Sequence, residues 1–128
     1  MKAYLNQGNS MKYIARLILI SLWFSSAMAA SFDCSKASTW VEKSICTEPL
    51  LGKLDEALAR NYQGMLASVG GHAKKEFKKE QLNWLTRRNQ CTSTVCLTEI
   101  YRKRVDETCD YGVVSGVHPE CSMSEDIK

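Results

Sequence analysis

The sequence predicts an all-α protein: a small helical bundle, with a short N-terminal helix and three longer helices, stapled by disulfides and followed by an irregular C-terminal tail. Three observations support this fold class. Apolar residues recur in steps of three and four from residue 51 onward, as on one face of a helix. No segment sustains the alternation of period two that marks a strand. Six cysteines all follow residue 30, and an even number in a short chain is typical of a disulfide framework.

The first two helices are marked by their start signals. Thr39 and Glu42 have the spacing of a capping box, which predicts a first helix over residues 39–46. A second helix is expected to open with Thr47 as its cap and Pro49 in its first turn, and to end at the glycine pair after residue 69. Its buried face is expected to hold Leu51, Leu54, Leu58, Tyr62, Met65 and Val69.

A third helix is expected over residues 72–88, and a fourth runs to about residue 108. The third should face inward with Phe77, Gln81, Trp84 and Leu85, so that Trp84 is buried between the second and fourth helices. Its outer face carries Lys74, Lys75, Lys78 and Lys79, which we interpret as a solvated face, with binding to an anionic envelope surface as the alternative. The fourth helix is expected to bury Val95, Leu97, Ile100, Tyr101 and Val105. Short turns join these helices into one bundle.

Residues 1–29 are typical of a secretory signal peptide rather than of a fold. Two cations, Lys12 and Arg16, precede an apolar run over residues 17–24. Small residues then end in an A-x-A pattern at Ala29, which is the usual form of a cleavage site. The apolar run is shorter than the roughly 20 residues that span a bilayer. We therefore expect this segment to be removed during export.

Cleavage is expected before Ala30, and Met11 is an alternative start for the same signal. The mature chain then consists of a helical domain, 30–108, and an acidic, disulfide-tied tail, 109–128. No cysteine stands at the cleavage point to carry a lipid. The expected product is a periplasmic or secreted protein without a stable membrane anchor.

The net charge of +3 belongs to the signal peptide. Removing its cations leaves 14 basic and 14 acidic residues in the mature chain. These charges are separated: residues 71–104 carry nine bases and three acids, whereas residues 105–128 carry six acids and one base. A neutral exported chain is a poor candidate for binding nucleic acid, and we expect none. The acidic tail favours a cationic protein partner instead.

The cysteines are expected to form structural disulfides. Zinc sites normally use a C-x2-C pair and redox centres use C-x-x-C, whereas the closest pair here is C-x4-C and only two histidines occur. We expect no metal site. Because each bond would then close a short segment, the preferred pairing is Cys34–Cys46, Cys91–Cys96 and Cys109–Cys121. A crossed pair such as Cys46–Cys96, which would tie the first helix to the fourth, is the main alternative.

The tail contains the candidate binding residues Ser115, Gly116 and His118. They lie inside the loop that a Cys109–Cys121 bond would close. Two interpretations stay open: an ordinary disulfide-tied tail, or a rigid finger that inserts into the cleft of a partner. A pre-ordered finger would bind more readily, because each side chain immobilised on binding costs about 0.5–1.5 kcal/mol. His72 follows two glycines at a helix start, where we expect it to be exposed and inert.

We do not expect an enzyme. Nucleophilic catalysis needs a nucleophile, a base and an orienting group brought together. The sequence contains neither a G-x-S-x-G elbow nor a glycine-rich phosphate loop, and nothing in it predicts a cofactor. A site assembled from distant residues would escape such motifs, so the class stays open as a minor alternative.

Two groups of residues resemble the LprI-type lysozyme-inhibitor domain. Those in the first half are Phe32-Asp33-Cys34, the VEKSIC segment at 41–46, Leu54-Asp55 and Tyr62. Those in the second half are Gln81, Trp84-Leu85, Arg88, Cys91, Cys96-Leu97, Tyr101 and Arg104. The resemblance covers residues 32–105 and implies an exported, cysteine-bearing, helical protein. The tail lies outside it, and the acylated cysteine of the lipoprotein that names the family has no counterpart here.

The resemblance also implies a function. We expect a binding protein that inhibits lysozyme by occluding its cleft, with lysozyme or another cationic envelope protein as the partner. That cleft works through two carboxylates, and a histidine or another cation between them would block it. The alternative is an envelope interaction or stress module without lysozyme activity. The resemblance assigns no inhibitory residue.

Overall fold

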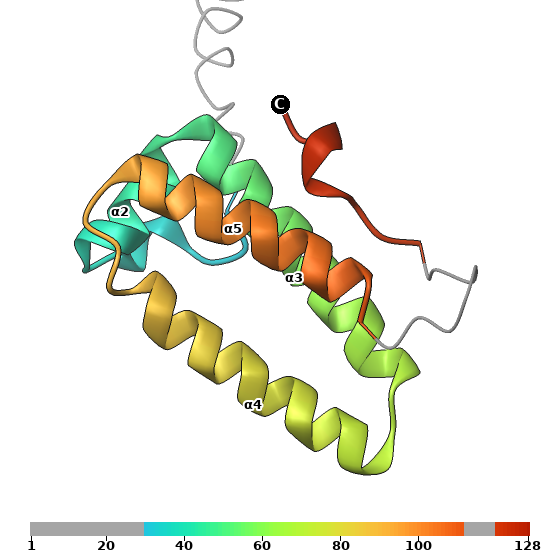
Figure 1. The fold of residues 1–128 in the computed structure, drawn as a ribbon. Coiled ribbons are helices and arrows are strands. Elements are labelled where there is room, and N and C mark those ends of the chain that lie inside the picture. The colour runs from blue at the N-terminus through green and yellow to red at the C-terminus, as the bar shows by residue number, and fades with distance from the viewer. Residues whose placement is uncertain (1–29, 112–119) are drawn as a thin grey trace, which may run out of the picture.

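The computed structural model describes residues 30–111 and 120–128 of the chain. Within them, four α-helices make up the fold (Figure 1): α2 (Trp40–Thr47), α3 (Pro49–Ser68), α4 (Gly71–Arg88) and α5 (Thr94–Cys109). Two short 3-10 helices flank them, η2 (Cys34–Lys36) and η3 (Ser124–Asp126). The predicted all-α fold, with one short helix and three longer ones, is confirmed. The expected signal peptide lies outside the described residues.

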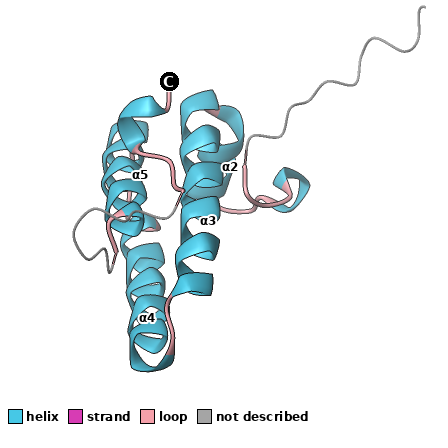
Figure 2. Ribbon diagram, turned by 90° about the vertical axis from the view of Figure 1, so that its right-hand side faces the viewer, coloured by secondary structure: helices cyan, strands magenta, loops and turns pink. Residues whose placement is uncertain are grey.

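The helices α3 and α5 form the centre of the bundle. They lie side by side along most of their length, and α2 packs against α3 (Figures 1 and 2). The leucines of α3 face this contact, as the three- and four-residue steps predict. The buried core includes Val41, Ile45, Leu51, Leu54, Leu58, Trp84, Leu97, Tyr101 and Val105. Each large apolar side chain buried in this way contributes roughly 1.5–3 kcal/mol of transfer free energy.

The helix α4 joins this pair through two large aromatic side chains. Phe77 and Trp84 are its buried residues, and the predicted burial of Trp84 is confirmed at 2% exposure. Phe77 stacks on Tyr62 of α3 with ring centroids 5.0 Å apart, and Trp84 meets Tyr101 of α5 edge to face at 5.1 Å. Because bulky rings make these contacts, the backbone of α4 approaches α5 less closely than α3 does. This spacing leaves room for a groove between α4 and α5.

The start of α2 has the predicted capping box. The Thr39 hydroxyl accepts from the Glu42 N–H at 3.2 Å, and the Glu42 carboxylate accepts from the Thr39 N–H at 2.9 Å. The start of α3 differs from the prediction. Thr47 is the last residue of α2, and its hydroxyl donates to the Lys43 carbonyl oxygen at 3.0 Å, so it does not cap α3. Glu48 occupies the capping position without a side-chain hydrogen bond, and a proline follows it as expected.

Three further positions correct the sequence pattern. The helix α3 ends before Val69, which is only partly buried and has an extended backbone. Gly71 does not terminate α3 but begins α4, with a φ of 53° that glycine adopts without steric cost. Val95, which was expected to face inward, is 65% exposed. It lies in the first turn of α5, and contact with the core begins only at Leu97, so the apolar spacing alone misplaces it.

The cysteines form the predicted sequential disulfides, and none is free. The bonds are Cys34–Cys46, Cys91–Cys96 and Cys109–Cys121. The first ties η2 to α2, the second clamps the turn between α4 and α5, and the third ties the end of α5 to the tail. The crossed pair Cys46–Cys96 is therefore excluded. Each bond restrains one connection of the bundle, which stabilises a small chain whose core is limited.

The tail is less irregular than the sequence suggests, because residues 120–128 pack back onto the bundle and contain η3 (Figure 1). The backbone N–H and the hydroxyl of Ser124 donate to the Asp106 carboxylate at 2.7 and 2.8 Å. The Arg102 guanidinium donates to the carbonyl oxygens of Ser124 and Ile127. The sequence pattern missed this docking because polar groups make these hydrogen bonds, and the apolar contact of the tail with the core comes from Ile127 rather than from an apolar stripe.

Candidate functional site

A buried polar network joins the N-terminal segment to α3 and α5. Its centre is Asp55 on α3, which is 6% exposed. One oxygen of its carboxylate accepts from the N–H and the hydroxyl of Ser31 at 2.8 and 2.6 Å. The other oxygen accepts from the Tyr101 hydroxyl at 2.7 Å. These hydrogen bonds offset part of the free-energy cost of burying the carboxylate, since an unsatisfied buried charge is strongly unfavourable.

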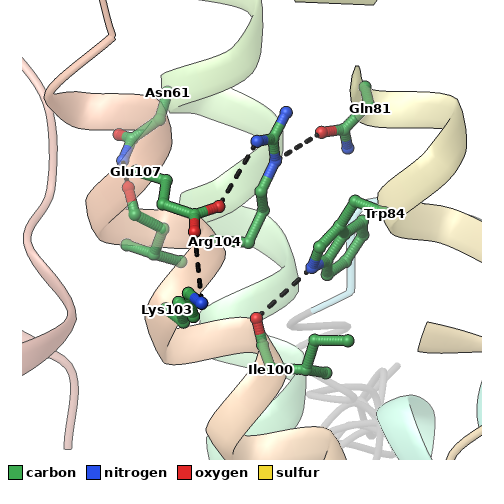
Figure 3. Close-up of polar contacts among 8 residues, drawn as sticks. Asn61, Gln81, Trp84, Ile100, Lys103, Arg104 and Glu107 are labelled. Atoms are coloured by element: carbon green, nitrogen blue, oxygen red, sulfur yellow. Dashed lines mark hydrogen bonds and ion pairs between the residues drawn. The ribbon is translucent and has the colours of Figure 1, made fainter. Parts of the chain in front are cut away.

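Tyr101 extends this network to α4. Burial, reinforced by the nearby charge of Asp55, raises the pKa of Tyr101 above its usual value, so the phenol stays protonated and donates. Arg88 donates from Nη1 to the Tyr101 hydroxyl at 3.2 Å, and its guanidinium lies 5.7 Å from the centroid of the Trp84 ring. Trp84 in turn donates from Nε1 to the Ile100 carbonyl oxygen at 3.3 Å (Figure 3). These contacts fix how α4 sits on α5, which is a structural role.

A groove with a volume of about 720 Å³ lies between α4 and α5. Its lining residues are Glu80, Asn83, Arg87, Lys103, Arg104, Asp106, Glu107, Asp110 and Tyr111. Groups of both charges line it, so the groove suits a polar partner surface better than an apolar ligand.

Arg104 is the buried cation of this groove (Figure 3). Its Nε donates to the Gln81 side-chain oxygen at 3.0 Å, and its Nη1 lies 3.5 Å from the Glu107 carboxylate. The ring of Phe77 lies 5.8 Å from the guanidinium carbon. Among the described residues, its Nη2 has no hydrogen-bond partner. Arg104 therefore positions Gln81 and Glu107 beside the groove while its own hydrogen bonding stays incomplete.

The groove ends at an aromatic stack beside the third disulfide. Tyr111 lies against Phe77 with ring centroids 4.3 Å apart, and its hydroxyl donates to the Ala73 carbonyl oxygen at 3.4 Å. Desolvation raises the pKa of Tyr111, and the charges of Glu80 and Glu76 raise it further. The stack thus holds the chain in place where it leaves α5.

A second hollow, of about 270 Å³, lies between the start of α2 and the turn that joins α4 to α5. It is lined by Thr39, Trp40, Val41, Asn89, Cys91 and Thr92, none of which is charged. Trp40 is 46% exposed, which is unusual for so large an aromatic ring. An exposed tryptophan beside a hollow is a common anchor in protein interfaces. The pattern of apolar residues gives no sign of this surface, because Trp40 belongs to a helix of only eight residues.

The predicted binding residues Ser115, Gly116 and His118 lie outside the described residues. Their role therefore stays a prediction. His72 is exposed in the first turn of α4, as expected. The lysines on the outer face of α4 are exposed as predicted, apart from Lys74, which is partly buried.

Among the described residues, no cluster of three histidine, cysteine or acidic side chains has the arrangement of a metal site. In the same part of the chain, no helix combines the length and the apolar character that crossing a bilayer requires. The three disulfides are typical of a protein from an oxidising compartment outside the cytoplasm.

Comparison with known proteins agrees with the resemblance seen in the sequence. A family model described as "Lysozyme inhibitor LprI" matches residues 33–108, which span η2 and nearly all of the helical bundle. No curated protein and no solved structure gives a significant match. The match stops one residue before Cys109, so the third disulfide and the tail lie outside it. The match covers more than half of the chain, which therefore belongs to the LprI family of lysozyme inhibitors.

Proposed function

We propose that this protein is a lysozyme inhibitor that acts outside the cytoplasm and occludes the cleft of the enzyme. Family membership supports inhibition of lysozyme, and the disulfides support the compartment. The occluding element is the loop closed by Cys109–Cys121, and Ser115, Gly116 and His118 are its contact residues. The observation that carries this assignment is that both ends of the loop are fixed to the helical domain.

Contacts with the helical domain hold the chain on both sides of the loop. The Cys109–Cys121 bond holds the two Cα atoms 5.6 Å apart, and Cys109 itself is buried. On the outgoing side, Tyr111 packs into the aromatic stack. On the returning side, Ser124 is held by Asp106 through two hydrogen bonds. A loop restrained in this way has less conformational freedom to lose on binding, which favours insertion into a cleft.

The charge of the C-terminal part of the chain supports a cationic partner. Residues 105–128 contain one base and six acids: Asp106, Glu107, Asp110, Glu120, Glu125 and Asp126. Asp106 and Glu107 lie in the last turn of α5, which contains no basic residue. Asp106 binds Ser124, and Glu107 pairs with Lys103 and Arg104 of the preceding turn. An acidic surface would accelerate association with a cationic enzyme.

The test is an assay of cell-wall lysis, read as the loss of turbidity, with lysozyme alone and with purified protein of residues 30–128. We expect this protein to slow lysis and a truncated protein of residues 30–108 to slow it much less. If neither protein affects any lysozyme tested, the family role does not extend to this chain. The alternative of an envelope interaction module without lysozyme activity then becomes the better account.

Full inhibition by the truncated protein would instead place the contact on the helical domain. The Trp40 hollow is the surface that this outcome favours, because it lies within residues 33–108 matched by the family. Trp40→Ala would then abolish inhibition. Val95→Ala is the matched control, since Val95 is also a large exposed apolar residue but does not line the hollow. If the loop is the occluding element, both substitutions leave inhibition unchanged.

A further inference from the structure

The position of Asp55 relative to the predicted start of the mature chain points to a maturation site. Asp55 is a buried carboxylate whose hydrogen bonds come from uncharged donors, Ser31 and Tyr101. None of the ion pairs found among the described residues involves it. A carboxylate in the interior is costly without a counter-charge nearby.

The predicted cleavage point lies immediately beside this carboxylate. The Ser31 N–H, 2.8 Å from Oδ2 of Asp55, belongs to the second residue of the expected mature chain. Ala30 precedes it and packs against the hydrophobic core. Standard bond lengths separate the nitrogen atoms of adjacent residues by at most about 3.7 Å, so the Ala30 nitrogen lies within about 6.5 Å of that oxygen.

On its Oδ1 side, Asp55 is linked to the cation Arg88 through the Tyr101 hydroxyl. We propose that removal of the signal peptide supplies a counter-charge on the opposite, Oδ2 side. Cleavage hydrolyses the peptide bond between Ala29 and Ala30: water is consumed, Ala29 gains a carboxylate, and the Ala30 nitrogen takes up a proton to become an ammonium group. Before cleavage this nitrogen is an uncharged amide. After cleavage a positive charge stands within about 6.5 Å of Asp55, and a small turn of the Ala30 backbone brings it into the range of about 4–6 Å over which opposite charges stabilise each other in a protein.

This arrangement couples processing to stability. An α-ammonium group ordinarily has a pKa of about 7.7–8.0, so it is mostly charged at neutral pH. The ion pair would fasten the first residues of the mature chain onto α3, next to the contact between Tyr101 and Arg88. The folded mature protein is thereby favoured over any form that still carries residues before Ala30. The device is independent of lysozyme binding, and it can fail or hold regardless of the proposed function.

A thermodynamic cycle tests the proposal with four proteins: residues 30–128 with a free Ala30 amine, the same protein with Gly-Ser added before Ala30, and the Asp55→Asn variant of each. The expected result is that the extension lowers the melting temperature by about 4–8 °C when Asp55 is present, the shift typical of one lost interaction worth 1 kcal/mol. In the Asp55→Asn background the extension should have almost no effect. Glu48→Gln, at an exposed acid without a side-chain cap bond, should leave the full effect in place.

Equal losses in both backgrounds, or no loss in either, would overturn the proposal. If Asp55→Asn does not fold, the pKa of the Ala30 amine in the unsubstituted protein decides instead, measured by NMR after ¹³C-methylation. Asp55 should raise this pKa above its usual range. Arg88, the cation that contacts Tyr101, opposes the shift, while Tyr101 stays neutral. A value at or below the usual range, or a mature protein that begins more than two residues from Ala30, contradicts the proposal.

Discussion

Asn61 on α3 pairs with Ser122 of the tail through both backbone groups of the serine. The Asn61 Nδ2 donates to the Ser122 carbonyl oxygen at 2.8 Å, and the Ser122 N–H donates to the Asn61 Oδ1 at 2.9 Å. The same Nδ2 donates to the Val105 carbonyl oxygen of α5 at 3.2 Å. One side chain from the family domain therefore holds the segment that lies outside the family match. The position of the tail depends on this contact as well as on the disulfide.

Asn61→Ala should lower the free energy of unfolding by about 1–3 kcal/mol, because it leaves the backbone groups of Ser122 without their partners near the buried face of α3. Denaturant unfolding measures this loss. Amide exchange of residues 120–128 should accelerate more than exchange within α3. Gln63→Ala, an exposed polar substitution on the same helix, is the control and should change stability by less than about 0.5 kcal/mol. Unchanged exchange in the tail would show that its other contacts, which include the disulfide, Asp106 and Arg102, hold it without Asn61.

Trp84→Ala should lower the free energy of unfolding by about 3–5 kcal/mol, because the ring fills the space between α4 and the core. Trp84→Phe keeps most of that packing but loses the bond from Nε1 to the Ile100 carbonyl oxygen, and it should cost less. The control is Leu82→Ala on the exposed side of α4, where the side chain is 65% exposed. A loss below about 1 kcal/mol for Trp84→Ala would mean that α4 packs differently on α5.

Most signals that act between residues close in the sequence predicted their part of the fold correctly; the cap assigned to Thr47 is an exception. The capping box of Thr39 and Glu42 spans three residues, and the paired cysteines bracket short segments. The buried face of α4 follows from helical spacing. Each of these features depends on the geometry of a single helix or turn. The geometry of a single helix or turn can therefore be predicted from the residues within it.

Other features were mispredicted or missed where contacts between distant segments determine which residues are buried or bonded. Val95 fits the apolar spacing but lies beyond the reach of the core, which only the position of the helix end determines. Asn61 lies among the leucines of α3, and its partner Ser122 is 61 residues away. The α4–α5 groove exists because Phe77 and Trp84 act as spacers, a consequence of side-chain size in the assembled bundle. The spacing of residues along the sequence does not predict the distance between two helices in the folded bundle.

Acidification should weaken the start of α2 through Glu42. The N–H groups of Thr39 and Ser38 donate to its carboxylate and lower the pKa of Glu42 to about 2. A carboxyl group whose pKa is lowered in the folded state stabilises the protein above its unfolded pKa of about 4.3. This contribution is lost as the pH falls from about 4.5 to 2.

Glu42→Gln should therefore lower the melting temperature by a constant amount above pH 5, and the difference from the unsubstituted protein should shrink below pH 4. Glu99→Gln, at an exposed position on α5, is the control and should show no such convergence. A difference that stays constant down to pH 2 would mean that the Glu42 charge does not support the cap.

The last prediction concerns the loop between Cys109 and Cys121. If it occludes the lysozyme cleft, His118→Ala should raise the inhibition constant without lowering the melting temperature, because the side chain would contact the enzyme and not the bundle. His72→Ala removes the other histidine, exposed in the first turn of α4, and should change neither quantity. Equal effects of both substitutions on inhibition would remove His118 from the mechanism.

Replacing both Cys109 and Cys121 with serine should weaken inhibition further than His118→Ala does, because it removes the bond that holds the two ends of the loop together. Asn61 and Asp106 still hold the returning segment in that variant, so the helical domain should stay folded.

Raised salt should slow association of the unsubstituted protein, since exposed charges are screened beyond about 8–10 Å at physiological ionic strength. Dissociation depends on the buried contacts of the loop, and it should respond to His118→Ala more than to salt. An association rate that is independent of salt would show that the acidic end of the molecule does not guide lysozyme to the loop.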